Sequence, residues 1–265
     1  MSAGAALRLA GTYRRRVGAS LARIWENVFD WEHLAHLHEG SFAACELLER
    51  GDWGWRVRLT GAGERASAQV IELRADRTAN RYCSTTLEGG GAGTEIRVTL
   101  APVATQEVDV TVEFHLLEER PDRLAALGAG YAAAYARLWD EDEAMMRARE
   151  RALAARAGPR PDEAAVDLGP EHQVRAGLPL SFSLRGEPFR LIELDGTLVA
   201  HATVCPHWLG PLGDAPVIDG AVRCPWHGYR FDVRTGACRT HPGLRLPLAP
   251  AVRVVDGRVL AEARR

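Results

Sequence analysis

The segment CPHWLGPLGDAPVIDGAVRCPWH, from Cys205 to His227, begins and ends with a cysteine–histidine pair. Cys205 and His207 form the first pair, Cys224 and His227 form the second, and sixteen residues separate the two pairs. Two cysteines and two histidines at such a spacing indicate a metal site. Zinc sites usually have two cysteines close together, followed by two histidines. Here each arm offers one thiol and one imidazole, which suits a two-iron cluster with two thiolates on one iron and two imidazoles on the other.

The residues around these pairs resemble the Rieske family of iron–sulfur proteins. Cys-x-His, Cys-x-x-His and the following Gly228–Asp232 match its two loops and the next strand, and the resemblance covers about residues 170–262. It implies a [2Fe-2S] cluster held by Cys205, His207, Cys224 and His227. Neither loop has the extra cysteine of the respiratory type, which favours the ferredoxin or oxygenase type. Trp208 stands where oxygenases often have arginine.

Composition fits an ordinary globular protein. The chain has 265 residues, 46% hydrophobic and 26% charged, enough for one large domain or two small ones. A net charge of -2 does not favour a nucleic-acid partner. There is no apolar run of about 18 residues for a membrane span, and Arg14–Arg16 precede a charged stretch rather than the apolar core of an export signal. Five cysteines do not suggest a disulfide framework. We therefore expect a cytoplasmic protein with no membrane partner.

The pattern predicts two domains of an α+β chain, residues 1–156 and 171–265, joined by a Pro-rich linker at 157–170. The second domain is predicted to be all β. In the first, a long antiparallel sheet precedes a long helix, which resembles the helix-grip (START/SRPBCC-like) fold, a sheet wrapped on its C-terminal helix. Such a fold leaves a cavity for a small ligand. Its expected elements are a strand at 7–19, a helix at 20–38, antiparallel strands over 42–118 and a helix at 121–155.

A second candidate metal site lies near the start of the chain. Asp30, His33 and His38 form Asp-x-x-His-x-x-x-x-His, preceded by Glu26-Asn27. This resembles the mononuclear-iron motif of Rieske oxygenase catalytic domains, in which the aspartate bridges a cluster histidine and an iron histidine. The five-residue spacing turns His38 by about 140° from His33 on a straight helix, so we expect the helix to end or bend near His36. His36 itself is expected to be a spare residue or a substitute ligand.

The third iron ligand is expected in the acidic run of the long helix, residues 140–143. Asp142 alone continues the apolar stripe, four residues after Leu138 and three before Met145. A carboxylate facing a core is costly unless it is paired or bound to a metal. Two histidines and one carboxylate form the ligand set of open ferrous sites that react with dioxygen. The alternative is that the whole run is a solvated helix surface.

Together these motifs predict a Rieske-type oxygenase with its domains in reversed order, since the Rieske domain comes first in familiar oxygenases. The resemblance implies O2 and a small organic, often aromatic, substrate, a reductase or ferredoxin as electron donor, and a trimer. Hydroxylation, dihydroxylation and demethylation are all open. The alternatives are a Rieske electron carrier fused to an iron-free ligand-binding domain and, with less support, a redox-sensing regulator. Candidate pocket residues, each also compatible with plain core, are Phe29, Phe42, Trp55, Tyr82, Phe114, Tyr131 and Tyr135.

Overall fold

The computed structural model describes residues 6–63, 67–158 and 161–264. The chain divides into two compact units, with the boundary between residues 150 and 151. Among the described residues, no helix is both long and apolar enough to cross a membrane.

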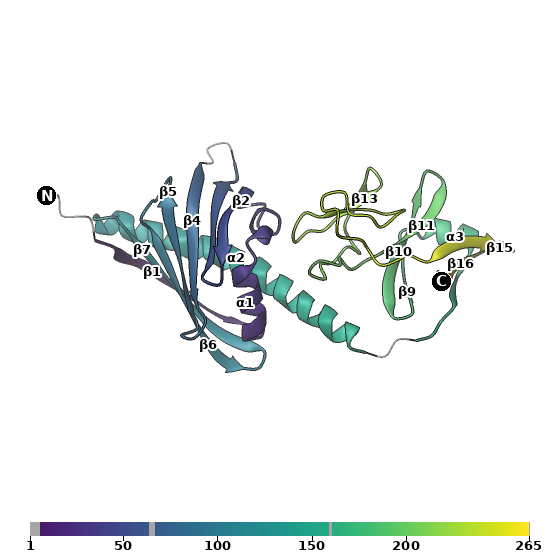
Figure 1. The fold of residues 1–265 in the computed structure, drawn as a ribbon, viewed down its shortest axis with the longest axis horizontal. Helices are drawn as coiled ribbons and strands as arrows, with labels where there is room; N and C mark the ends of the chain where they lie inside the picture. The colour runs from purple at the N-terminus through teal and green to yellow at the C-terminus, as the bar shows by residue number, and fades with distance from the viewer. Residues whose placement is uncertain (1–5, 64–66, 159–160, 265) are drawn as a thin grey trace. The chain divides into compact units, whose positions relative to one another are not determined.

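The N-terminal unit is built on a seven-stranded antiparallel sheet in the order β1-β7-β6-β5-β4-β3-β2 (Figure 1). The first strand thus pairs with the last, and the others follow one another as a meander. This confirms the expected antiparallel sheet followed by a long helix. The strands are β1 (Arg8–Val17), β2 (Phe42–Gly51), β3 (Gly54–Gly61), β4 (Ala68–Asp76), β5 (Arg81–Glu88), β6 (Glu95–Ala104) and β7 (Glu107–Leu116).

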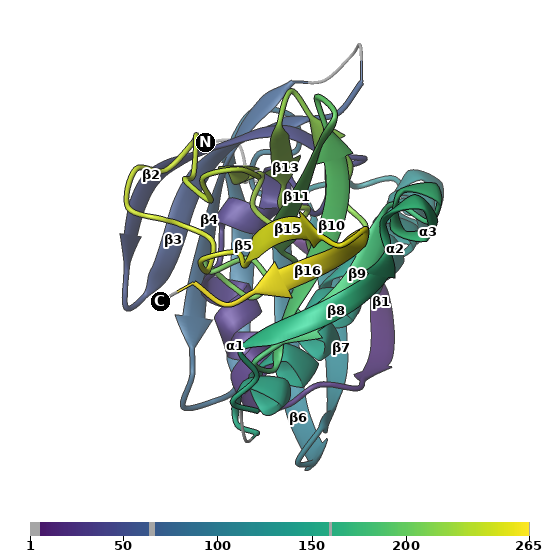
Figure 2. The same ribbon diagram turned by 90° about the vertical axis from the view of Figure 1, so that its right-hand side faces the viewer.

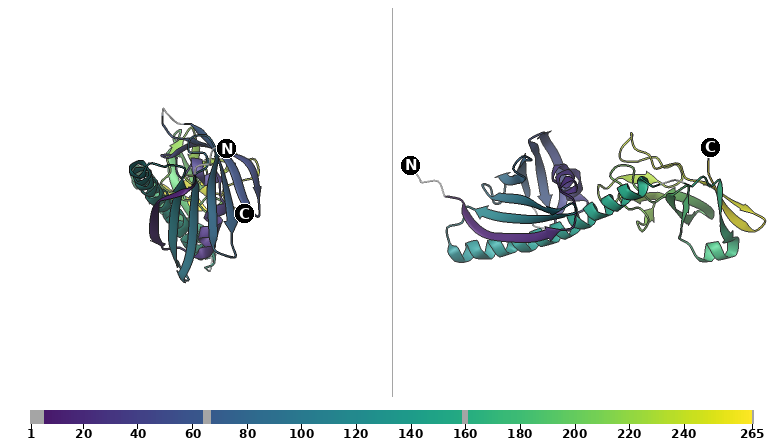
Figure 3. Two further views of the ribbon diagram at one scale, coloured as in Figure 1. Left: turned by 90° about the vertical axis from the view of Figure 1, so that its left-hand side faces the viewer. Right: turned by 90° about the horizontal axis from the view of Figure 1, so that it is seen from below.

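Alternation along the strands decides which face of the sheet is buried. In β7, Val108, Val110, Val112 and Phe114 occupy every second position and are at most 1% exposed. Side chains two residues apart point to the same face of a strand, so this sequence presents one continuous apolar face. The long helix α2 (Pro121–Arg156) runs along the sheet (Figure 3).

The first helix is shorter than the sequence suggests. Helix α1 (Leu21–Phe29) begins at Ser20, whose hydroxyl accepts a hydrogen bond from the Arg23 amide, and it ends at Asp30. A short 3-10 helix, η1 (Glu32–Ala35), follows. The prediction of one helix over residues 20–38 is therefore wrong: the break lies at Asp30 and not near His36. Asp30 has a ψ of 85°, far from the helical value of about -42°, which takes the backbone out of the helix.

The C-terminal unit contains three three-stranded sheets in its described residues, in the orders β11-β10-β9, β12-β13-β14 and β15-β16-β8. Figure 2 labels every strand of the first and third of these sheets. Residues 165–170, which the sequence assigns to the linker, form strand β8 instead and pair with β16. The elements are β8 (Ala165–Pro170), α3 (Glu171–Ala176), β9 (Leu180–Leu184), β10 (Glu187–Leu194), β11 (Thr197–Ala202), β12 (Val217–Ile218), β13 (Ala221–Arg223), β14 (Arg230–Asp232), β15 (Ala251–Val255) and β16 (Arg258–Glu262).

Helix α2 meets strand β1 at a glycine contact. A methyl group on Gly128 would collide with the backbone of Ala10, including its carbonyl oxygen. Gly128 therefore sets how closely the helix approaches the sheet. At Gly130, two residues further on, a methyl group would meet no other atom within 4 Å.

We expect Gly128→Ala to lower the free energy of unfolding by about 2 kcal/mol, because the helix and the strand must separate to admit the methyl group. Gly130→Ala is the matched control and should raise it by up to about 1 kcal/mol through helix propensity. Urea unfolding of the full chain measures both. Equal effects of the two substitutions would contradict the close contact.

Candidate functional site

The two cysteine–histidine loops of the C-terminal unit share one backbone design. The amide of Cys205 donates to the carbonyl of Gly210, and its own carbonyl accepts from Leu209. The amide of Cys224 donates to Tyr229, five residues on, and its carbonyl accepts from Gly228, four residues on. The residue four after each cysteine has a positive φ, 65° at Leu209 and 69° at Gly228. A non-glycine residue in this region is strained, so the first loop holds its shape at a local cost.

These loops bring the four predicted cluster ligands together. Both thiols are fully buried and hydrogen-bond to each other. The rings of His207 and His227 lie 4.6 Å apart between centroids, at 84°. The hydrogen bond from Cys205 lowers the pKa of Cys224 against the opposing effect of burial, and the same pairing raises the pKa of Cys205. Two buried thiols that face each other are a donor set that fits a metal cation, and the two imidazoles beside them complete the set for a two-iron cluster.

Aromatic rings flank the two imidazoles. The ring of Trp208 lies 5.6 Å from that of His227 and 6.3 Å from that of His207. The ring of Tyr229 lies 4.8 Å from that of His207, edge to face. Trp208, the departure from the arginine of oxygenases, thus packs beside both histidines with an uncharged ring.

The second predicted site also converges, in the N-terminal unit. His33 from η1, His38 from the turn before β2, and Asp142 from α2 offer ligand atoms that all lie within 4.8 Å of one another, and all three residues are buried. Asp142 Oδ1 lies 3.4 Å from His33 Nε2 and 3.2 Å from His38 Nε2. Two ligand atoms about 2.1 Å from a shared ion and about 100° apart are separated by about 3.2 Å. The three residues therefore have the spacing and chemistry of a metal site.

Local backbone structure explains how the histidines meet. The chain leaves α1 at Asp30, and the amides of His36 and Leu37 then donate to the carbonyl of His33. The carbonyl of His38 accepts from the amides of Ser41 and Phe42, which closes the turn into β2. This turn brings His38 to the ligand face of His33, as the five-residue spacing requires. His36 is half-buried and lies outside the group of three.

Each imidazole has a second carboxylate on its other nitrogen. Asp30 Oδ2 lies 3.4 Å from His33 Nδ1, and Glu141 Oε2 lies 2.6 Å from His38 Nδ1. Metal-binding histidines commonly donate their free N–H to a carboxylate, which fixes the ring and the tautomer. Asn27 Nδ2 donates to Asp142 Oδ1 at 2.9 Å and orients that carboxylate in the same way. The roles of Glu141 and Asn27 were not predicted, although both lie in motifs that the sequence singles out.

Charge holds this group together despite its burial. Burial raises the pKa of Asp142, but the hydrogen bond with His38 and the charges of both histidines lower it further, and the net direction is downward. Burial lowers the pKa of His38, yet Asp142 and Glu141 raise it overall. The other acids of the run differ, since Asp140 and Glu143 bind the guanidinium of Arg15. Asp142 is thus the inward-facing acid, as its place in the apolar stripe predicts.

A cavity of about 150 Å³ adjoins the three candidate ligands, which all contribute to its lining. Among the predicted pocket residues, Phe42, Trp55, Tyr82 and Tyr135 line it, whereas Phe29, Phe114 and Tyr131 pack in the surrounding core. Ser84, Thr86 and Trp139 line it but were not predicted. Alternation along β5 is the signal that finds Ser84 and Thr86, since they follow Tyr82 at every second position.

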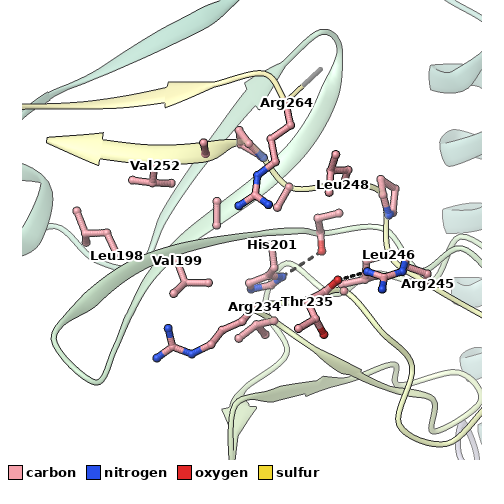
Figure 4. Close-up of a pocket in the computed structure, with 18 of the residues that line it drawn as sticks. Leu198, Val199, His201, Arg234, Thr235, Arg245, Leu246, Leu248, Val252 and Arg264 are labelled. Atoms are coloured by element: carbon pink, nitrogen blue, oxygen red, sulfur yellow. Dashed lines mark hydrogen bonds between the residues drawn. The ribbon is translucent and has the colours of Figure 1, made fainter. Parts of the chain in front are cut away.

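A larger cavity, of about 490 Å³, lies in the C-terminal unit (Figure 4). Its lining includes Arg234, Arg245, Arg264 and the buried His201, whose Nδ1 donates to the carbonyl of Ala202 at 3.0 Å. Burial lowers the pKa of His201. None of the predicted metal ligands lines this cavity, so its size does not make it the candidate site.

Comparisons with known proteins bear on the C-terminal unit. Residues 164–250 match the family model of the Rieske [2Fe-2S] domain. The anthranilate 1,2-dioxygenase ferredoxin subunit of Burkholderia cepacia is 33% identical over 73 residues, which are 28% of this chain and 68% of that protein. The dicamba O-demethylase oxygenase component of Stenotrophomonas maltophilia is 35% identical over 65 residues, 24% of this chain and 19% of that protein.

Two further similarities differ from these in how much of each chain they cover. Human apoptosis-inducing factor 3 is 41% identical over 54 residues, which are 20% of this chain. The chain therefore spans only 9% of the length of that relative. Over the N-terminal part, a START superfamily protein from Mycobacterium smegmatis is a similar solved structure, with a TM-score of 0.43, 17% identity, and coverage of 51% of this chain and 95% of that chain.

The paired loops, each with one thiol and one imidazole, define an iron–sulfur protein with mixed cluster ligands. With the matching family model and a relative covered over two thirds of its length, the chain belongs to the Rieske [2Fe-2S] family. The expectation of a C-terminal Rieske domain is confirmed.

We expect Cys224→Ser to abolish the [2Fe-2S] cluster, because the alcohol is a poor ligand for iron where a thiolate is needed. The measurement is the visible absorption and iron content of the purified chain. Cys238→Ser is the control: Cys238 lies outside both loops, with its Sγ 3.4 Å from Thr240 Oγ1, and its loss should leave the cluster intact. A cluster retained in Cys224→Ser would exclude this ligand.

We expect Glu141→Gln to weaken Fe²⁺ binding at the N-terminal site by about tenfold or more, because it removes the carboxylate that holds His38. Anaerobic equilibrium dialysis of the full chain measures the affinity. Asp140→Asn, one residue away and mostly exposed, is the control and should bind Fe²⁺ as the unsubstituted chain does. The same affinity in all three proteins would mean that Glu141 does not position the ligand.

Proposed function

We propose that the chain is a Rieske-type oxygenase that uses electrons, passed through its [2Fe-2S] cluster, to activate O2 for oxidation of a small organic molecule. The cluster ligands are Cys205, His207, Cys224 and His227. A mononuclear ferrous ion is held by His33, His38 and Asp142. The observation that carries the proposal is the convergence of these last three buried residues beside a cavity.

The donor set supports iron rather than a closed structural metal. Three protein ligands from one face leave open positions, and two histidines with one carboxylate are typical of ferrous sites that react with dioxygen. Such an ion would supply the site at which O2 is reduced, and the cluster would supply single electrons. Hydroxylation, dihydroxylation and demethylation all remain within this reaction class.

The chain's own residues hold and orient the reacting groups. His33 and His38 would bind through Nε2, while Glu141 holds the ring of His38 through its Nδ1 and Asp30 lies 3.4 Å from Nδ1 of His33. In the oxygenases that the motif resembles, the aspartate bridges to a cluster histidine, and we assign that role to Asp30. The apolar walls of the cavity, such as Leu34, Phe42 and Ile71, limit the access of water to the site.

The proposal has consequences for partners. An oxygenase of this type needs an external reductase or ferredoxin as its electron donor. The resemblance extends the proposal to a cytoplasmic homo-oligomer, such as a trimer. The reversed domain order does not prevent electron transfer, which depends on the distance between the two centres and not on their order in the chain.

A second candidate is a Rieske electron carrier fused to a ligand-binding domain without iron. It is favoured by the relative from Burkholderia cepacia, a ferredoxin subunit that the chain covers over 68% of its length. The two candidates predict different iron contents, three ions per chain for the oxygenase and two for the carrier.

We expect the chain, reconstituted anaerobically with Fe²⁺, to hold three irons, one of which a chelator removes without bleaching the cluster. Asp142→Asn should hold two, because the amide keeps the shape but not the charge of the ligand. Metal analysis together with visible absorption measures both centres.

Asp140→Asn is again the control, with three irons expected. A wild-type chain that takes up only two irons under excess Fe²⁺ would favour the electron carrier and remove the oxygenase proposal.

A further inference from the structure

The cavity beside His33, His38 and Asp142 has a distinctive charge pattern. Of its 18 lining residues, the only charged or titratable ones besides these three are Tyr82 and Tyr135. The lining includes no arginine, and its remaining polar side chains are Asn27, Ser84, Thr86 and two tryptophans. Asn27 is already engaged with Asp142, and the indole of Trp55 donates to the carbonyl of Val28.

Tyr82 and Tyr135 come from different walls of the cavity, the first from β5 and the second from α2. Their rings are fixed by neighbours: Tyr82 meets Trp25 edge to face at 6.3 Å, and Tyr135 meets Phe114 in the same way at 5.2 Å. Burial raises the pKa of each phenol above its ordinary value. Both hydroxyls therefore stay protonated at neutral pH and can donate a hydrogen bond.

Both tyrosines line the cavity, so a ligand that enters it meets their side chains directly. A hydroxyl that faces a cavity can donate a hydrogen bond to a ligand that carries an acceptor oxygen. Ser84 and Thr86 stand on the same face of β5 as Tyr82 and add further polar contacts on that wall.

The volume of the cavity and the charges of its lining also limit which ligand can bind. A cavity of about 150 Å³ is the size that admits a benzene molecule in a protein core. An anion in this space would lose its hydration, find no arginine or lysine, and face the carboxylate of Asp142. The cation bound by the histidines and Asp142 is already balanced in part by that carboxylate.

We propose that this cavity selects a compact, uncharged molecule of about one six-membered ring, whose hydroxyl or carbonyl oxygen is held by Tyr82 and Tyr135, and that it discriminates against carboxylates. This rests on the proposed function only for what happens to the ligand afterwards. Binding itself requires no turnover and can be measured separately.

The test is isothermal titration of the full chain, with its cluster intact and under anaerobic conditions, against phenol, benzene and benzoate. These probes share one ring and differ in the group attached to it. We expect phenol to bind at least tenfold more tightly than benzoate and about fivefold more tightly than benzene. The titration is done with Fe²⁺ and again after chelation, so that ligation of benzoate to the metal is seen as a difference between the two.

Variants assign the effect to the two phenols. Tyr82→Phe and Tyr135→Phe should each reduce the affinity for phenol about fivefold and leave that for benzene within twofold. Tyr131→Phe is the matched control, since Tyr131 stacks on Phe114 at 5.5 Å but does not line the cavity, and it should change neither affinity.

Benzoate that binds as tightly as phenol, with or without iron, would overturn the selection against carboxylates. Equal losses for phenol and benzene in the tyrosine variants would show a packing role instead of a hydrogen bond. If phenol binds as expected while the chain holds only two irons, the ligand class stands and the oxygenase proposal fails. If three irons bind and phenol does not, the oxygenase proposal stands and the proposed ligand class fails.

Discussion

The buried carboxylate of Asp142 between two imidazoles is the interaction on which the N-terminal unit depends for its chemistry. A carboxylate in this position is unfavourable unless polar partners surround it, and here the Nε2 atoms of His33 and His38 lie within 3.4 Å of its Oδ1, to which Asn27 donates a hydrogen bond. Its place is set by the register of α2, which the close contact of Gly128 with β1 fixes against the sheet. Packing at a glycine near the start of the helix thus controls where an acid about four turns later meets its partners.

The parts of the site that could be predicted are those encoded by spacing. The Cys–His pairs could be identified from their positions in the sequence alone. Asp142 followed from the helical period, because a buried stripe repeats every three to four residues. The end of α1 could not be predicted this way, because Asp30 leaves the helix through backbone torsions that the apolar pattern does not report. Strand β8 was missed since its partner β16 lies about 90 residues later, and a six-residue strand that ends in Gly-Pro has little signal before it pairs.

Glu141 shows a different limit. From its position in the helix it is a surface acid, and its side chain is in fact 44% exposed. Only the turn that brings His38 back toward α2 places an imidazole nitrogen 2.6 Å from it. Contacts between a helix surface and a distant turn depend on tertiary geometry, so a pattern along one helix cannot distinguish Glu141 from Asp140, which binds Arg15 instead.

The cluster-ligand group and the proposed iron-ligand group of the chain are built differently. The cluster loops repeat one rigid hydrogen-bond pattern and surround their ligands with backbone and rings, which suits a group that only gains and loses electrons. The N-terminal group gathers its ligands on one side and leaves a cavity on the other, with polar hydroxyls on two walls. The proposed function, in which dioxygen and a substrate meet at this site, needs such an open side, and the uncharged lining would then decide which molecules can lose their hydration to enter it.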